Sequence, residues 1–353
     1  MTSNSVEKTL FATDQSWLDR RREAIIEPEL PIVDPHHHLW DRGARYLLEE
    51  VLAVLNTGHR VLATVFLQCD SMYRVDGDHV LRPVGETEFV NGIAAAAASG
   101  TYGPTKVCDG IVGFADLYLG SEVDRILELH LSRGGERFKG VRHCSVWDAD
   151  QTIKSTPMGF PKGVLMDDKF RAGFARLSRY GLSFDGWLYH TQVPEFTDLA
   201  RAFPETTMIL DHVGAPLAIG AYANKRAEVF ADWKKSMRDL ATCPNANVKL
   251  GGLGMHVFGF GYDHAPDPVS SEILATAWRP YVETCIELFG PGRCMFESNF
   301  PVDKRSCSYH VLWNAFKRLA SSASATEKAL LFKDTAIRVY RLGGVERGSS
   351  LSG

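Results

Sequence analysis

Three consecutive histidines, His36, His37 and His38, follow a short apolar run near the start of the sequence. On an extended segment alternate side chains project to the same side, so His36 and His38 face one way and His37 the other. Two imidazoles on one face can hold a metal ion or a water, because neutral imidazole is a common ligand for zinc and similar ions. We therefore expect His36 and His38 to lie in a site and His37 to have a structural role.

Other polar residues stand where further apolar runs end. His190 could be a third metal ligand, since a catalytic zinc commonly has three protein ligands and a water. His212 could transfer protons, because imidazole titrates near neutral pH. Arg142 could grip a carboxylate through two hydrogen bonds. Any one of these residues could instead cap a strand or join two loops, but together they predict a common site.

Four more residues lie beside these positions. Gln68 and Trp40 could contact a substrate, through an amide and through a stacked ring. Lys249 could either reach the site or lie against a helix layer with its ammonium group in water. Asp211 immediately precedes His212, and neighbours on a strand face opposite ways. We therefore expect Asp211 to be a structural partner rather than the base.

Eight short β-branched runs alternate with longer helical patterns, which is typical of a (β/α)₈ TIM barrel. The runs cover residues 31–36, 60–68, 110–117, 139–146, 182–190, 206–212, 246–252 and 293–299, and helices are predicted over 121–133, 169–181, 193–203 and 280–290. A doubly wound sheet is the alternative. In a closed barrel all carboxyl ends of the strands open on one side, so the residues named above would meet there.

The chain divides into three parts in this interpretation. Residues 1–30 form an amino-terminal extension with a short charged helix over 14–27, residues 31–343 form the barrel domain, and residues 344–353 form a flexible tail. Loop insertions are expected at 70–108, 147–168 and 253–271, and the first and third of them start where a strand ends. Such loops build the catalytic face of a barrel.

Charge and cysteine content restrict the partners. With 39 basic and 43 acidic residues well mixed, the net charge is −4, and no basic stripe suits nucleic acid. The seven cysteines are scattered and contain no C-x-x-C pair, as expected of reduced thiols in a cytoplasmic protein. No apolar run is long enough to span a membrane. We expect a small-molecule substrate, and the amino-terminal helix could serve as a contact in a homo-oligomer.

Five ordered sequence pieces carry a resemblance to a known family. They are VDPHHHLWD at 33–41, FKGVRH at 138–143, LDHVGAP at 210–216, NVKLGG at 247–252 and MFESNFPVD at 295–303. With them the chain resembles the amidohydrolase superfamily, in the branch of lactone hydrolases and metal-dependent aromatic-acid decarboxylases. The pieces GVRH and DHVGAP, together with a histidine pair followed by LWD, are more similar to the sugar-lactonase and dicarboxylate-lactonase group.

The resemblance implies roles for particular residues. It implies that His36, His38 and His190 line a metal or water site, and that His212 contacts substrate or transfers protons. It also implies that Arg142 binds an anionic or polar part of the substrate. The implied cofactor is a divalent metal such as zinc.

One departure from the family affects both the metal and the base. The family commonly ends its eighth strand with aspartate, whereas this sequence has Asn299. Asparagine cannot accept a proton at neutral pH, and it removes a negative charge from a metal site. His212, Asp303 and Glu297 are the candidates for the base, and whether a metal is bound stays open. Asn299 itself could contact substrate.

The function that these observations predict is hydrolysis of a lactone by an activated water. No Walker-type or dinucleotide glycine motif and no G-x-S-x-G elbow occurs in the sequence. The alternative is a nonoxidative decarboxylase of a hydroxylated aromatic acid, which needs a firmly held divalent cation, and Asn299 argues against such a site. A third interpretation is a barrel that binds a ligand without catalysing a reaction.

Overall fold

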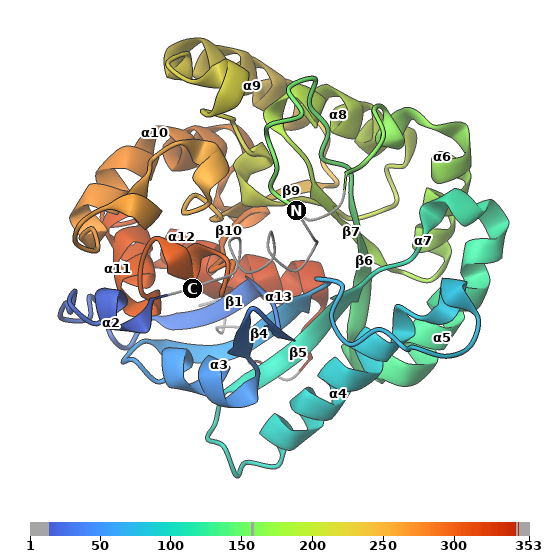
Figure 1. Ribbon diagram of the computed structural model, residues 1–353, viewed down its shortest axis with the longest axis horizontal. Coiled ribbons are helices and arrows are strands. Elements are labelled where there is room, and N and C mark those ends of the chain that lie inside the picture. Colours follow the sequence, from blue (N-terminus) through green and yellow to red (C-terminus); the bar gives the residue numbers. More distant parts are fainter. Residues whose placement is uncertain (1–13, 157–158, 344, 346–353) are drawn as a thin grey trace, which may run out of the picture.

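The structure, a computed structural model, describes residues 14–156, 159–343 and 345, and its centre is a barrel of parallel strands (Figure 1). Eight strands form one sheet in the order of the sequence. They are β1 (Pro31–His37), β4 (Arg60–Leu67), β5 (Lys106–Gly113), β6 (Phe138–Cys144), β7 (Ser183–Trp187), β8 (Met208–Leu210), β9 (Ala246–Leu250) and β10 (Cys294–Phe296). All eight predicted strands are confirmed.

The first and last strands meet, which closes the sheet. The backbone N–H of His38 donates to the carbonyl of Phe300 at 2.8 Å, and that of Asn299 donates to the carbonyl of His36 at 2.9 Å. A parallel bridge also joins His37 and Phe300. A doubly wound sheet would reverse its strand order at a switch point. The sequential order and the closure therefore show a (β/α)₈ barrel.

The barrel has two apolar cores, one inside the strands and one between strands and helices. The inner core contains Val33, Val65, Val112, Ile209 and Met295, together with Ile337 and Tyr340 of the last helix, α13 (Thr335–Tyr340). Arg338 of α13 donates to the Asn247 side chain at 2.9 Å and to the Gly292 carbonyl at 2.7 Å, near the starts of β9 and β10. Helix α13 thus closes the amino-terminal end, and the site lies at the other end.

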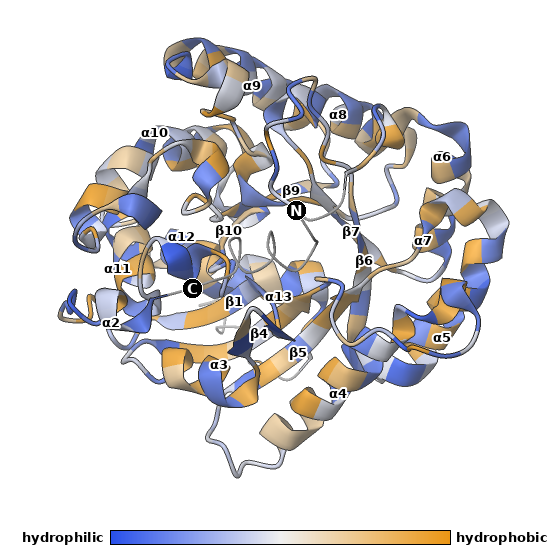
Figure 2. Cartoon of the chain, viewed as in Figure 1, coloured by the Kyte–Doolittle hydropathy of each residue, from blue (hydrophilic) through white to orange (hydrophobic). Residues whose placement is uncertain are grey.

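The outer layer consists of amphipathic helices. They are α3 (Leu48–Leu55), α4 (Val84–Ala98), α5 (Asp124–Gly134), α6 (Asp168–Phe174), α7 (Arg176–Arg179), α8 (Val193–Ala202), α9 (Arg226–Leu240), α10 (Ser271–Phe289), α11 (Tyr309–Leu319) and α12 (Ala325–Ala329). Figure 2 shows hydrophobic and hydrophilic residues side by side on these helices. Within the described ranges, none of the helices is both long and apolar enough to cross a bilayer.

The helix predictions were correct in place but not always in length. Predicted helices 121–133 and 193–203 correspond to α5 and α8. The predicted helix 280–290 is only the second half of α10, because Ser270 caps the helix by accepting from the Ile273 N–H at 3.3 Å and the helix continues through Pro280. The predicted helix 169–181 is divided into α6 and α7.

Two expectations about loops and ends need correction. Only Gln15–Leu18 (α2) is helical within the predicted helix 14–27, because polar groups of the following residues bond to distant parts of the chain instead. The expected insertion 70–108 contains α4, a regular outer helix of the barrel. A hairpin of β2 (Trp40–Arg42) and β3 (Ala44–Tyr46) was not predicted. The predicted flexible tail, 344–353, lies outside the described residues except for residue 345.

Candidate active site

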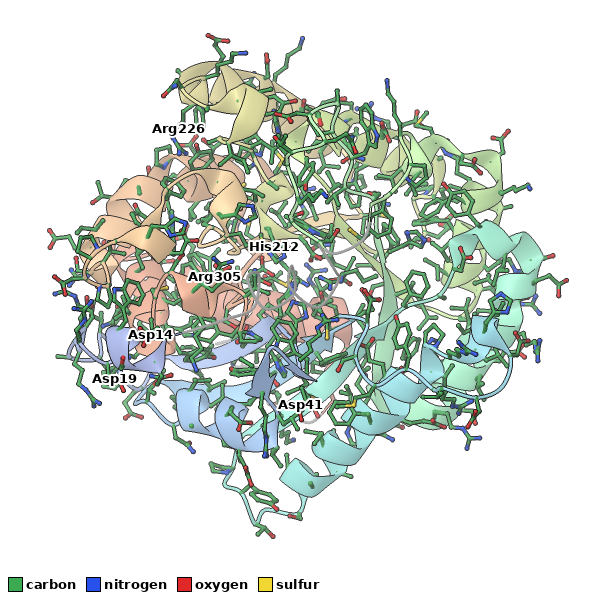
Figure 3. The ribbon with its side chains drawn as sticks, in the orientation of Figure 1. Asp14, Asp19, Asp41, His212, Arg226 and Arg305 are labelled. Carbon is green, nitrogen blue, oxygen red and sulfur yellow. The ribbon has the colours of Figure 1, made fainter. Side chains whose placement is uncertain are left out.

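A cavity of about 270 Å³ opens at the carboxyl ends of the strands. Six of the predicted site residues line it, namely His38, Trp40, Gln68, Arg142, His212 and Asn299. They follow or end β1, β4, β6, β8 and β10, so the barrel brings together residues that are far apart in the sequence. Figure 3 shows His212 and Arg305, which also lines the cavity, near the centre of the ring of helices.

Glu297 joins two of the histidines beneath this cavity. Its two carboxylate oxygens lie 2.7 Å from His36 Nδ1 and 2.7 Å from His212 Nδ1. A carboxylate oxygen only accepts, so both Nδ1 atoms carry the proton and both Nε2 atoms carry a lone pair. Burial alone would raise the pKa of Glu297, but the neighbouring His212 and His36 hold it at about 2. The shared carboxylate therefore fixes the tautomer of both rings.

His38 has its tautomer fixed by the backbone. Its Nδ1 lies 2.8 Å from the Leu67 carbonyl oxygen, which accepts only. The rings of His36 and His38 have centroids 4.9 Å apart, and those of His36 and His212 are 4.6 Å apart. Burial lowers the pKa of both His36 and His38 well below the ordinary value, so both rings are neutral. His37 instead contacts Thr64 Oγ1 at 2.8 Å on the other side of β1.

The turn after β8 moves Asp211 into the same cluster, contrary to the expectation that it faces away from His212. Strand β8 ends at Leu210, and His212 and Val213 have φ of +54° and +50°. A positive φ is energetically costly for residues other than glycine, and residues in this conformation are frequent at functional sites. Asp211 Oδ1 lies 3.6 Å from His36 Nδ1. Neither carboxylate oxygen of Asp211 has a hydrogen-bond partner among the described residues.

Two buried cations lie next to these groups. Arg142 donates from Nε to Gln68 Oε1 at 3.2 Å, and its Nη1 lies 3.5 Å from His36 Nε2 and 3.8 Å from Asp211 Oδ2.

Lys249 was predicted to reach the substrate or the helix layer, and it does neither. Strand alternation turns it into the barrel, where its side chain is completely buried beneath His36.

Asn299 lies between His38 and Asp303. Its Nδ2 donates to Asp303 Oδ1 at 2.9 Å, and its Oδ1 lies 3.3 Å from His38 Nε2. Asp303, predicted as a candidate base, is completely buried and also accepts from the Gly254 N–H at 2.9 Å. Burial raises the pKa of Asp303 to about 7. Because it lies behind Asn299 and does not line the cavity, Asp303 cannot contact a substrate directly.

His190, predicted as both a metal ligand and a catalytic residue, does not join the cluster. Its Nδ1 accepts from the Leu217 N–H at 3.3 Å, and its ring packs on Tyr222. Strand β7 ends at Trp187, which is in the register that faces the cavity, and His190 begins the next turn. The Trp187 and His212 ring centroids are 4.8 Å apart, so a tryptophan occupies the position where the histidine was expected.

The cluster has the composition of a site for a zinc-like ion. His36, Asp211 and His212 bring ligand atoms within 4.8 Å of one another. Ligating histidines usually donate their second ring N–H to a carboxylate or carbonyl, as His36, His38 and His212 do here. The Asp211 carboxylate, which forms ion pairs with Lys249 and Arg142 but accepts no hydrogen bond among the described residues, also suits a cation. The residues therefore fit a divalent metal, although Arg142 and Lys249 already supply positive charge nearby.

Comparison with known proteins identifies the family of the chain. The amidohydrolase family model matches residues 33–342. The chain belongs to the amidohydrolase family. This amidohydrolase is 32% identical over 329 residues to an uncharacterised protein of Sinorhizobium fredii, covering 89% of this chain and 99% of that one. It is 25% identical over 326 residues to an L-fucono-1,5-lactonase of Burkholderia multivorans, covering 88% and 96%.

A solved structure has the same fold. The crystal structure of an amidohydrolase from Burkholderia multivorans with bound zinc matches with a TM-score of 0.66 and 22% identity. The match covers 88% of this chain and 99% of that one.

Sequence reasoning underestimated the acidic residues of this amidohydrolase. Glu297 was only one of three candidate bases, and Asp185, which bonds to Lys249, was not singled out. Side chains alternate along β7, so Asp185 lies on the same face as Trp187. This alternation could have marked Asp185 as a residue that points into the barrel. The role of Glu297 had no local signal, since it depends on two histidines from distant strands.

Proposed function

We propose that this amidohydrolase opens a lactone by attack of an activated water. The observation that carries the proposal is the contact of His212 Nδ1 with Glu297 at 2.7 Å, at the edge of the cavity. This contact leaves Nε2 of His212 free to accept a proton. The carboxylate would then stabilise the imidazolium that forms, as the buried acid does in other acid–base pairs.

The reaction needs four coordinated changes. His212 Nε2 takes a proton from water as the water oxygen bonds to the lactone carbonyl carbon. Arg142, which lines the cavity, donates to the oxygen that becomes negative. The ring carbon–oxygen bond then breaks, and His212 returns the proton to the departing oxygen. The product is an open hydroxy acid.

A divalent ion would act on the attacking water and on the lactone carbonyl. His36 and Asp211, whose ligand atoms lie within 4.8 Å of each other, are the residues that would hold it. When bound, such an ion supplies a Lewis acid that favours deprotonation of water and polarises the carbonyl. His212 would remain the group that moves the proton.

The substrate class is a lactone of a sugar acid. Asp70, Asp116 and Asp263 line the cavity and could accept hydrogen bonds from ring hydroxyl groups. Trp40 and Trp187 provide flat apolar walls for a sugar ring. The similarity to an L-fucono-1,5-lactonase supports this substrate class, at 25% identity.

The first test is a panel of sugar-acid and dicarboxylate lactones, with acid release followed by pH indicator. We expect at least one sugar-acid lactone to be opened, and His212→Ala to lower kcat about 10²- to 10⁴-fold, as loss of a general base does. His190→Ala is the matched control, since His190 is buried outside the cavity, and it should change kcat only a few-fold. Failure to open any lactone of the panel would contradict the proposal.

The decarboxylase alternative has its own measurement. Release of carbon dioxide from hydroxylated aromatic acids, in the presence of added zinc or manganese, would favour that activity instead. We expect none, because Asn299 leaves the site with one negative ligand fewer than an aspartate would.

A further inference from the structure

A lysine ammonium group lies directly under the candidate metal ligands. Lys249 is completely buried, and its Nζ lies 2.7 Å from Asp185 Oδ1, 3.0 Å from Asp211 Oδ1 and 3.1 Å from His36 Nδ1. The two carboxylates are donors that a divalent ion would take. The ammonium group therefore already occupies part of the coordination environment of the site.

The hydrogen-bond partners of this group can be assigned. His36 Nδ1 is protonated because it contacts Glu297, so it cannot accept from Lys249. The ammonium group therefore donates to Asp185 Oδ1 at 2.7 Å and forms an ion pair with Asp211 Oδ1 at 3.0 Å. The hydroxyl group of Tyr340 also donates to Asp185 at 2.5 Å. Asp211 thus lies between Lys249 on one side and the candidate position of a divalent ion on the other.

The charges enclosed around the site nearly cancel. Asp185, Asp211 and Glu297 contribute negative charges, and Lys249 and Arg142 contribute positive charges, while His36 and His38 are neutral. Charges this deep in a protein are weakly screened, so each strongly affects the binding of another ion. Without Lys249, the enclosed charge would be one unit more negative and Asp211 would lose its partner.

We propose that Lys249 is a resident cation that weakens divalent metal binding at this site and makes folding of the site independent of metal. In the absence of an ion, the ammonium group donates to Asp185 and balances the charge of Asp211 through an ion pair, and it repels an ion that approaches His36 and Asp211. This inference rests on the candidate metal site of the proposed function, but it does not depend on lactone opening.

Zinc titration of the metal-free protein tests this inference. Lys249→Met, which keeps the length of the side chain and removes its charge, should bind zinc at least tenfold more tightly by calorimetry. It should also melt at a lower temperature without zinc and regain most of the loss with zinc. Lys317→Met is the matched control, because Lys317 is another buried lysine that contacts a histidine, His59 at 2.9 Å. The control should leave zinc affinity unchanged.

Asp185→Asn provides a test of opposite sign. It removes one partner of Lys249, so the ammonium group should interact more strongly with Asp211 and zinc affinity should fall several-fold.

If Lys249→Met does not fold, the double variant Asp185→Asn, Lys249→Met keeps the enclosed charge of the wild type, and it should still bind zinc more tightly. Equal or weaker zinc binding by both Lys249 variants would overturn the proposal. Lactone opening is measured separately, so a protein inactive on lactones would leave this test intact.

Discussion

At the scale of residues, the acidic partner of the histidines decides their chemistry. Glu297 receives N–H groups from His36 and His212, both at 2.7 Å. A glutamine has one accepting oxygen and one donating NH₂ group, so it can satisfy only one of these rings. The other ring would rotate or change its tautomer. Glu297 is therefore a positioning residue for two imidazoles at once.

We expect Glu297→Gln to lower kcat about 10- to 100-fold, the usual cost of losing a carboxylate behind a functional histidine. The change should affect KM less, because Glu297 does not line the cavity. The pH dependence of kcat, measured on an active lactone, should shift as the imidazolium of His212 loses its stabilising charge. A variant with wild-type kcat and pH dependence would contradict this assignment.

The neutral amide of Asn299 has a local explanation. Asp303 Oδ1 lies 2.9 Å from the Asn299 amide nitrogen, so an aspartate at 299 would place two carboxylates side by side. Like charges at this separation cannot both ionise without cost. One of the pair would keep its proton in the folded protein at a pH where the unfolded chain has lost it. Stability should therefore fall as the pH rises.

We expect Asn299→Asp to lower the unfolding temperature at pH 8 more than at pH 6, relative to the wild type at each pH. The double variant Asn299→Asp, Asp303→Asn removes one carboxylate and should reverse most of the loss. Thermal unfolding followed by circular dichroism measures both. An equal loss at the two pH values would show that packing, not charge, limits the substitution.

At the scale of elements, α2 and the segment after it brace a wall of the cavity. Trp17 Nε1 donates to the Ala265 carbonyl at 3.1 Å, Arg21 Nε donates to that of Pro268 at 2.9 Å, and Glu23 accepts from the Ser271 N–H at 2.8 Å. The loop between β9 and α10 carries Asp263, which lines the cavity. The amino-terminal extension is thus a positioning element for this loop.

We expect Trp17→Ala to speed hydrogen exchange in residues 253–268 and to raise KM several-fold with little change in kcat, because the catalytic histidines lie on other elements. Trp17→Phe keeps a ring but removes the N–H donor, so it should give a smaller effect of the same kind. Unchanged exchange in this loop would mean that the extension does not brace it.

At the scale of the whole molecule, buried neutral histidines make stability depend on pH. Burial lowers the pKa of His37, His59, His130 and His190 to about 4, and it also holds the pKa of His36 and His38 well below the ordinary value. Below about pH 6.5 the unfolded chain binds protons at these positions and the folded protein does not. Four buried acids, Asp34, Glu86, Asp185 and Asp303, have raised pKa values and act in the opposite direction.

Because these six histidines outnumber the four acids, we expect stability to fall on acidification from pH 7 to pH 5. Each histidine contributes up to about 1.4 kcal/mol per pH unit in this window. The unfolding temperature of the metal-free protein, measured across the range, checks the direction. An unfolding temperature that is constant or rises toward pH 5 would contradict it.

Local patterns in the sequence determined the strands and the side on which their residues lie. The eight runs alternate or are uniformly apolar, and both patterns depend only on neighbours along the chain. His36 and His38 therefore share a side, with His37 opposite. The order of the runs, together with the right-handed connections expected of such units, was enough to predict the barrel.

The tertiary structure alone decided what happens after each strand ends. A left-handed turn brings Asp211 and His212 into one cluster, whereas the turn after β7 directs His190 toward Tyr222. The alternation of side chains along β9 directs Lys249 into the barrel. Its ion-pair partner Asp211, however, follows another strand, β8. The physical reason is that strand alternation is a local property of the backbone, whereas a loop conformation and the partner of a buried charge depend on contacts between distant segments.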